Sequence, residues 1–276
     1  FEHSVGVYLL LHQYGAPLEE QIAGLIHDVS HTAFSHIADY VLSNSGDRHD
    51  FQDSVFERFV KNSEIPAILQ KHGFDLENIL DDSRHPLKEN ENPDICADRI
   101  DNCLRDALAF KELSDEDLTY LLGKLKVQGN RWFFADYASA RKISDLFSKC
   151  NRIYWAGITT GVMHISFGEY LKRAIAQNYI TREDLFLTDE EVLKKIEKYH
   201  KSDELLRLYF DRASNKVGYR NDPDDYEVEV VTKSRVIDPW CLHEGVLQRV
   251  SEVDPAWAEV VKEELQPKRY FLKFDR

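Results

Sequence analysis

This sequence lacks the long apolar runs and leader-like segments that mark membrane and secreted proteins. No run within the 276 residues reaches the length of a membrane span, and no segment has the charged, apolar and small-residue order of a signal peptide. Cysteine is also scarce, and the four cysteines form no Cys-x-x-Cys pair: Cys96, Cys103, Cys150 and Cys241. These absences predict a cytoplasmic protein with reduced thiols and no membrane contact.

Basic residues are too few for a protein built to hold a polyanion. The chain has 35 Lys and Arg against 49 Asp and Glu, a formal net charge of −14, and its basic clusters are short. Proteins that bind nucleic acid usually carry a basic face, so this class of partner is disfavoured. A small phosphate ester in a metal pocket stays compatible with this charge, because the local field there outweighs the net charge.

Helical patterns dominate what is present. Helices are predicted over residues 2–13, 18–29, most of 137–179, and near 254–265. The segment Thr188-Asp-Glu-Glu reads as a capping box that opens a further helix. The helix that carries Asp98 is expected to take Asp94 as its N-cap, and Asp50 is a plausible N-cap for the helix that follows it.

Strand patterns are confined to a few short segments. Residues 126–135 predict a hairpin that turns at Gly129-Asn130. Alternating apolar residues return in 226–232 and again in 270–274. The prediction is therefore a mainly α fold, with a helical domain over residues 1–200 and a small α+β appendage over residues 201–276.

Histidines crowd into the start of the chain. Of 11 in all, six fall within the first 49 residues: His3, His12, His27, His31, His36 and His49. Any one alone is best explained as a satisfied polar group on a helix. The pair His27-Asp28, however, interrupts an apolar stripe at Ile22, Leu25 and Ile26, where a charged Asp is costly unless it is paired or bound to metal.

A ligand set for one divalent metal follows from these residues. We expect His3, His27, Asp28 and Asp98 to be the ligands, each on a predicted helix. Imidazole together with carboxylate suits Zn, Fe, Mn or Ni, with Mg as a further candidate, and disfavours sites that need thiolate. Such a metal predicts a hydrolase rather than a binding module.

Three segments carry a family resemblance: Phe1-Glu-His-Ser-Val-Gly, the run from His27 to His36, and the stretch from Asp98 to Asp106. Together they resemble the HD-domain superfamily of metal-dependent phosphohydrolases, named for its His…His-Asp…Asp ligands. Within it, the ten-residue run with three histidines is most similar to the deoxynucleoside triphosphate triphosphohydrolase branch. In that branch an Arg stands just before this Phe, so we expect this chain to be trimmed.

The resemblance implies roles for residues beyond the ligands. It places His31 and His36 against phosphate, makes His49 a candidate general acid, and counts Asp28 as catalytic as well as metal-binding. Spacing alone leaves open that His27 and His31 are a His-x-x-x-His metal pair. It also leaves open that His49 is a surface loop residue.

On the substrate side, the resemblance implies contacts from Arg99, Asp106 and Tyr154. Asp101 and Asp106 both have a simpler explanation as carboxylates on a helix surface. The resemblance favours Asp106, as a partner of a sugar hydroxyl or of a metal ligand.

Departures from the branch bear on the number of phosphates. Arg99 replaces a Lys and keeps its charge, whereas Asn102 replaces a Tyr. Ala156 and Gly157 stand where the branch places His and Lys on phosphate. The sequence thus offers fewer cations than a triphosphate needs.

The predicted function is metal-dependent hydrolysis of a phosphate ester, most simply that of a nucleotide, and the resemblance implies an activity like that of the deoxynucleoside triphosphate triphosphohydrolases. Two alternatives are a nucleoside monophosphate phosphatase or small phosphodiesterase of the same superfamily, and a non-catalytic module that binds a nucleotide. Members of the branch often self-associate, so a homo-oligomer is also expected.

Overall fold

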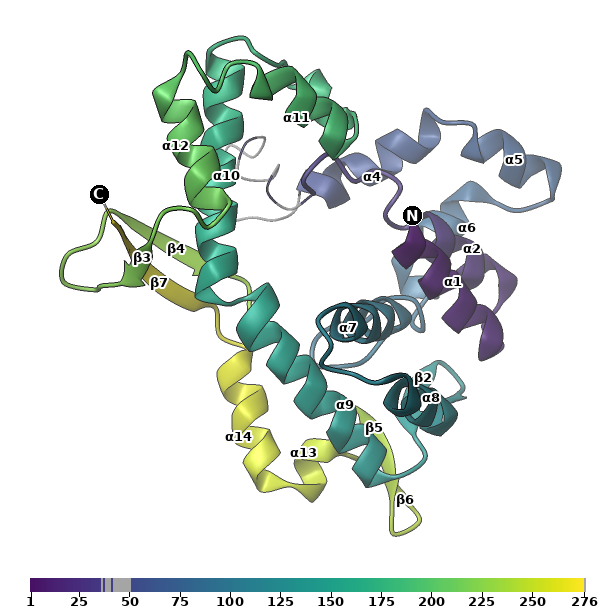
Figure 1. Ribbon diagram of the computed structural model, residues 1–276. Helices are drawn as coiled ribbons and strands as arrows, with labels where there is room; N and C mark the ends of the chain where they lie inside the picture. Colours follow the sequence, from purple (N-terminus) through teal and green to yellow (C-terminus); the bar gives the residue numbers. More distant parts are fainter. Residues whose placement is uncertain (36, 38–40, 42–50, 276) are drawn as a thin grey trace. The chain divides into compact units, whose positions relative to one another are not determined.

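The computed structural model describes residues 1–35, 37, 41 and 51–275, which form two compact units (Figure 1). The first unit draws on residues 1–28, 63–156 and 233–267, and the second on the described parts of 29–62, 157–232 and 268–276. Both units are therefore assembled from segments far apart in the sequence. Neither unit begins or ends at residue 200. The predicted division of the chain at that residue stays a prediction.

The first unit is mostly helical. Its helices are α1 (Glu2–Gln13), α2 (Leu18–Ile26), α5 (Ile65–Lys71), α6 (Leu76–Leu80), η1 (Asp82–Arg84), α7 (Ala97–Ala109), α8 (Asp115–Lys124), α9 (Tyr137–Cys150), the π-helical turn η2 (Asn151–Trp155), α13 (Val250–Val253) and α14 (Pro255–Glu264). Helix α1 matches its predicted range. Helix α2 ends at Ile26, three residues short of its predicted end.

A small sheet completes the first unit. Its strands are β1 (Leu125–Gln128), β2 (Arg131–Phe134), β5 (Trp240–His243) and β6 (Val246–Arg249), in the order β1-β2-β5-β6. β1 and β2 form the predicted antiparallel hairpin, in which Gly129 takes a positive φ of 62° at the turn. β2 pairs in parallel with β5, so residues assigned to the appendage in fact extend the sheet of the hairpin.

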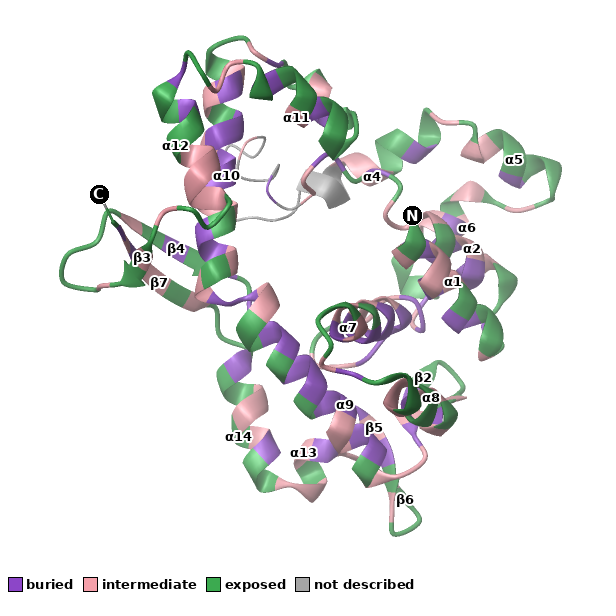
Figure 2. Ribbon diagram, viewed as in Figure 1, coloured by how far each residue is buried: buried purple, intermediate pink, exposed green. Residues whose placement is uncertain are grey.

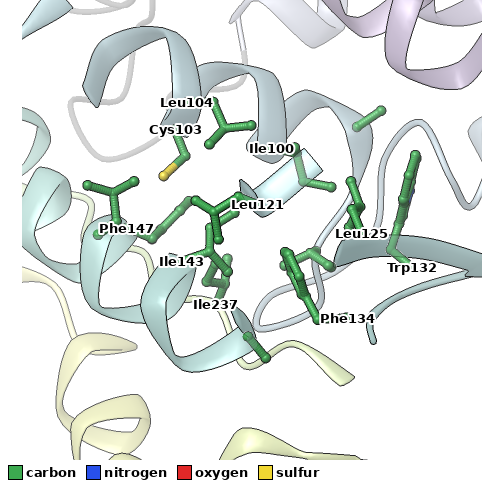
Figure 3. Packing of buried hydrophobic residues seen from close by; sticks show 14 of the residues in the cluster. Ile100, Cys103, Leu104, Leu121, Leu125, Trp132, Phe134, Ile143, Phe147 and Ile237 are labelled. Atoms are coloured by element: carbon green, nitrogen blue, oxygen red, sulfur yellow. The ribbon is translucent and has the colours of Figure 1, made fainter. Parts of the chain in front are cut away.

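Helix α7 lies at the centre of the hydrophobic core of this unit. Ile100, Cys103, Leu104 and Ala107 are buried at the i, i+3, i+4, i+7 spacing of one helix face. They pack with residues of α8, α9 and the sheet, such as Phe134 (Figure 3). The opposite face of α7 is left to polar residues, and it is this face that carries Asp98.

The start of α7 departs from the prediction. The N-cap of α7 is Cys96 rather than Asp94. The side chain of Asp94 pairs with Arg249, and the backbone carbonyl of Asp94 accepts a hydrogen bond from Arg99. The predicted capping box at Thr188 and Glu191 is confirmed. The predicted cap at Asp50 lies outside the described residues.

The second unit combines helices with a three-stranded antiparallel sheet. Its elements are α4 (Phe51–Lys61), α10 (Ile158–Ala176), η3 (Glu183–Phe186), α11 (Asp189–Glu197), α12 (Glu204–Ala213), β3 (Tyr219–Asn221), β4 (Val228–Thr232) and β7 (Lys268–Phe274). The strand order is β3-β7-β4. Buried residues lie along α10, whereas α12 buries Leu206 and is otherwise partly or fully exposed (Figure 2). The alternating segments predicted at 226–232 and 270–274 overlap β4 and β7, which pair with each other in this sheet.

The fold class is mainly α with small sheets, as predicted from the sequence. Across the described part of the chain, none of the helices combines the length and the apolar character that crossing a bilayer would need.

Candidate metal centre

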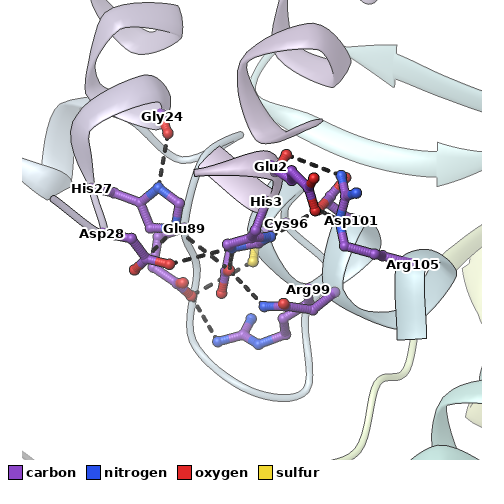
Figure 4. A network of polar contacts seen from close by, with 12 residues as sticks. Glu2, His3, Gly24, His27, Asp28, Glu89, Cys96, Arg99, Asp101 and Arg105 are labelled. Carbon is purple, nitrogen blue, oxygen red and sulfur yellow. Dashed lines mark hydrogen bonds and ion pairs between the residues drawn. The ribbon is translucent and has the colours of Figure 1, made fainter. Parts of the chain in front are cut away.

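Three helices of the first unit bring the predicted ligands together (Figure 4). His3 comes from α1, His27 and Asp28 follow the end of α2, and Asp98 lies in the first turn of α7. His27 Nε2 lies 3.4 Å from Asp28 Oδ1 and 3.7 Å from Asp98 Oδ1. His3 Nε2 lies 3.7 Å from Asp28 Oδ2 and 2.8 Å from Asp98 Oδ1. Ligand atoms about 2.1 Å from a tetrahedral zinc are roughly 3.4 Å apart, so this spacing suits one ion.

Two glycines allow the helices to approach this closely. A Cβ built on Gly6 of α1 would stand 1.9 Å from Asp101 Oδ1 on α7. A Cβ on Gly24 of α2 would stand 2.6 Å from a methyl of Leu11 on α1. A side chain at either position would require the neighbouring side chain, Asp101 or Leu11, to shift.

A buried carboxylate ties α2 to the loop before α7. Glu20 is 3% exposed and accepts hydrogen bonds from the backbone N–H groups of Leu87 and Lys88, at 2.6 and 2.9 Å. The carbonyls of the same two residues accept from the N–H groups of Ala97 and Asp98. The chain thereby fixes where α7 begins relative to His27.

The ring of His27 is presented as a ligand. Its Nδ1 donates to the carbonyl of Gly24 at 2.8 Å, which leaves Nε2 as the lone-pair nitrogen. That Nε2 is buried and makes no hydrogen bond with any group in the described residues. A buried nitrogen without a partner is costly, and it faces two carboxylates. The donor set therefore fits a divalent metal.

His3 is held from behind by a carboxylate. Its Nδ1 donates to Asp101 Oδ2 at 2.8 Å, and Arg105 donates to both oxygens of Asp101. A ligand histidine that is oriented by a carboxylate in this way is common in metal sites. Burial alone would lower the pKa of His3, but the hydrogen bonds to Asp101 and Asp98 outweigh it and raise the pKa to about 9 in the metal-free protein.

Asp98 stays ionised at the centre of this group. Burial by itself would raise the pKa of its carboxyl, but the nearby imidazole of His27, 3.7 Å away, and the hydrogen bond from His3 at 2.8 Å lower it well below its usual range. Asn102, one turn on, donates to Asp98 Oδ1 at 2.9 Å. The residue that replaces the branch's Tyr thus contacts a candidate ligand.

A second acidic group adjoins the first. Glu89, Cys96 and Asp98 also place one ligand atom each within 4.8 Å of the others. Burial raises the pKa of the Cys96 thiol far above its ordinary value, so it stays protonated and is a poor ligand. Glu89 is instead committed to Arg99, which donates to it at 2.7 Å.

The structure separates the predicted accessory residues. Arg99 is paired with Glu89, Asp106 accepts from Trp155 Nε1 at 2.7 Å, and Tyr154 donates to Glu112 at 2.8 Å. Asp101, not Asp106, is the carboxylate that contacts a candidate ligand, so the preference for Asp106 in that role was wrong. The helix position alone did not distinguish them; the close approach of Gly6 to Asp101 does. Glu89 was missed because its segment is polar and irregular.

His31 does not lie on a continuation of α2. The helix ends before it, and His31 is an exposed residue of the second unit. The same-face argument for a His27–His31 pair therefore fails, and the phosphate role of His31 rests on the motif. His36 and His49 lie outside the described residues, and their roles stay predictions.

Metal binding is expected to release a proton from His3. With its pKa at about 9, His3 is protonated at pH 7.5 in the metal-free protein, whereas a ligand imidazole must be neutral. Metal affinity should rise roughly tenfold per pH unit up to about pH 9 and then level off. Calorimetric titration of chelated protein at several pH values, in buffers of different ionisation enthalpy, measures both effects. A pH-independent affinity below pH 9 would rule this out.

Comparison with known proteins identifies a family model and two related sequences, one of which covers most of the chain. The model of the family described as HD domain matches residues 1–106. "Uncharacterized protein YdhJ" of Bacillus subtilis is 36% identical over 276 residues, which cover 93% of this chain and 80% of that protein. "Metal-dependent phosphohydrolase cns2" of Cordyceps militaris is 39% identical over 125 residues, which cover 45% of this chain and 36% of that protein.

Solved structures share the fold. A hypothetical protein from Aquifex aeolicus has a TM-score of 0.64 at 22% identity, covering 99% of this chain and 82% of its own. A phosphohydrolase from Bacteroides thetaiotaomicron has a TM-score of 0.69 at 12% identity, and the match covers 100% of this chain and 87% of that one. At such identities the likeness is one of fold.

Proposed function

We propose that this chain, which belongs to the HD-domain family of metal-dependent phosphohydrolases, hydrolyses a phosphate ester of a nucleotide. The buried Nε2 of His27, without a hydrogen-bond partner in the described residues and facing two carboxylates, is the observation that carries the proposal. A purely structural histidine would have no reason to leave that nitrogen unsatisfied.

In this proposal His3, His27, Asp28 and Asp98 hold one divalent metal. When bound, such a metal acidifies water and offsets charge on phosphoryl oxygens. Asp101 keeps His3 oriented, and Glu89 keeps Arg99 in place beside Asp98. His31 and His49 supply contacts to phosphate or a proton for the leaving oxygen, as their motif implies.

The charge around this group favours few phosphates. Arg99 and Arg105 both lie on α7, but each is already paired with a carboxylate, Glu89 and Asp101 respectively. Ala156 and Gly157 add no cation. Three linked phosphates need several cations to offset their charge, so we place a nucleoside monophosphate ahead of a triphosphate.

A nucleotide panel tests this proposal. With Mn²⁺ loaded, a nucleoside monophosphate should be hydrolysed with a kcat/KM at least about tenfold above that for the matching triphosphate, a difference of roughly 1.4 kcal/mol in transition-state stabilisation. Phosphate, pyrophosphate and triphosphate are quantified separately. A strong preference for the triphosphate, with triphosphate released, would contradict the charge argument. Binding of nucleotide without release of any product would instead favour a regulatory module.

A further inference from the structure

Arg235 stands apart from the other arginines near the candidate metal centre. Arg99, Arg105 and Arg249 of the same unit each pair with a carboxylate. The Arg235 guanidinium makes no hydrogen bond or ion pair with any residue that the structure describes, although the residue is half-buried. A guanidinium taken partly out of water without a partner is unfavourable.

The backbone around Arg235 is firmly held. Its N–H donates to Oδ1 of Asn151, at 3.0 Å, in the π-helical turn η2. Asn151 is fully buried, and its Nδ2 donates to Ser234 at 2.9 Å and to Glu264 at 2.7 Å. The π-helical turn thus presents an amide side chain that fixes the residue before Arg235 and the N–H of Arg235 itself. Such turns are frequent at functional sites.

The segment after Arg235 is anchored against the loop that precedes α7. Val236 and Ile237 are buried in the same core as Ile100. The N–H of Asp238 donates to the carbonyl of Pro93 at 2.7 Å, five residues before Asp98. Arg235 therefore lies between two fixed points, one on η2 and one beside the start of α7.

Its charge acts on the candidate metal centre. Burial lowers the pKa of Arg235. The charge of Arg99 lowers it further, whereas the charges of Asp98 and Glu89 act in the opposite direction and raise it. A bound metal would take up the charge of Asp98. The charge of Arg235 would then be left without compensation, and an unpaired guanidinium of this kind is suited to an anion.

We propose that Arg235 is a substrate-contacting residue whose guanidinium binds the phosphate group that is hydrolysed at the neighbouring metal centre. This inference rests on the proposed function and adds to it a cation from a distant part of the sequence. A guanidinium offers two parallel N–H groups to phosphate oxygens, which an ammonium cannot do. One such residue suits a single phosphate group.

Binding of inorganic phosphate to Mn²⁺-loaded protein tests the inference. Arg235→Gln should weaken phosphate binding, and raise the KM for a nucleoside monophosphate, by about 10- to 150-fold, as expected for hydrogen bonds to a charged group. Arg235→Lys should recover part of the loss. Lys233→Gln is the matched control, because Lys233 is an exposed cation two residues away, and it should behave as the wild type. Metal content and thermal stability are measured on the same samples.

The outcomes separate this inference from the function beneath it. An active wild type with Arg235→Gln binding phosphate equally well overturns the inference alone. Loss of metal or stability in Arg235→Gln, with phosphate affinity per loaded site unchanged, would make Arg235 a support for Asp98 instead. A metal-loaded wild type that neither binds phosphate nor hydrolyses a nucleotide overturns the proposed function, and this inference with it.

Discussion

Asp98→Ala is expected to purify without its metal and to lose hydrolysis with it. The carboxylate of Asp98 lies within 3.7 Å of both ring nitrogens that face the centre, so its removal leaves two imidazoles and Asp28. It also removes the anion that keeps the positive charge of the metal favourable in a partly buried position. Elemental analysis should find most of the metal gone, and no added nucleotide should be hydrolysed above background.

A graded series on the same helix makes this result specific. Asp101→Asn should keep the metal site but weaken metal affinity by about 10- to 100-fold, as removal of a group that orients a ligand typically does. Asp106→Asn is the matched control, since Asp106 contacts Trp155 rather than a candidate ligand. Full metal content in Asp98→Ala would remove Asp98 from the ligand set. Equal metal loss in Asp106→Asn would show general damage to α7.

The candidate ligands could be proposed from the sequence because much of their signal is local. The His-Asp pair breaks an apolar stripe, and the motif around it is specific. The choice between Asp101 and Asp106 could not be made this way. On α7, Asp101 lies one turn after Asp98 and Asp106 two turns after it, so periodicity leaves both near one face. What decides is the close approach of α1 at Gly6, a contact across 95 positions of the chain.

Local sequence patterns also could not predict which distant segments of the chain pair with each other. The Gly-Asn turn indicates the hairpin β1–β2, and the prediction placed this hairpin correctly. Its extension by β5 is a parallel pairing of Phe133 with Trp240 that no periodicity indicates. For the same reason Arg235 has no motif of its own. Its position depends on a hydrogen bond to Asn151, which lies 84 residues earlier.

His31→Ala is expected to keep its metal and lose rate. The family resemblance implies that His31 contacts phosphate, and the structure removes the alternative of a His27–His31 pair on one helix, since α2 ends at Ile26. General acid–base groups typically contribute 10²–10⁴-fold, or roughly 3–5 kcal/mol of barrier. We expect a loss of kcat in that range at unchanged metal content, measured on protein reconstituted with Mn²⁺.

Substrates that differ in their leaving group tell which of the two roles His31 has. If His31 protonates the leaving oxygen, a phosphate ester of an acidic phenol should be hydrolysed almost as fast by His31→Ala as by the wild type, because that oxygen departs without a proton. If His31 only holds phosphate, the loss should be similar for good and poor leaving groups, and product phosphate should bind more weakly. Loss of metal in this variant would instead restore His31 as a ligand, brought to the centre by the loop after α2 rather than by helical spacing.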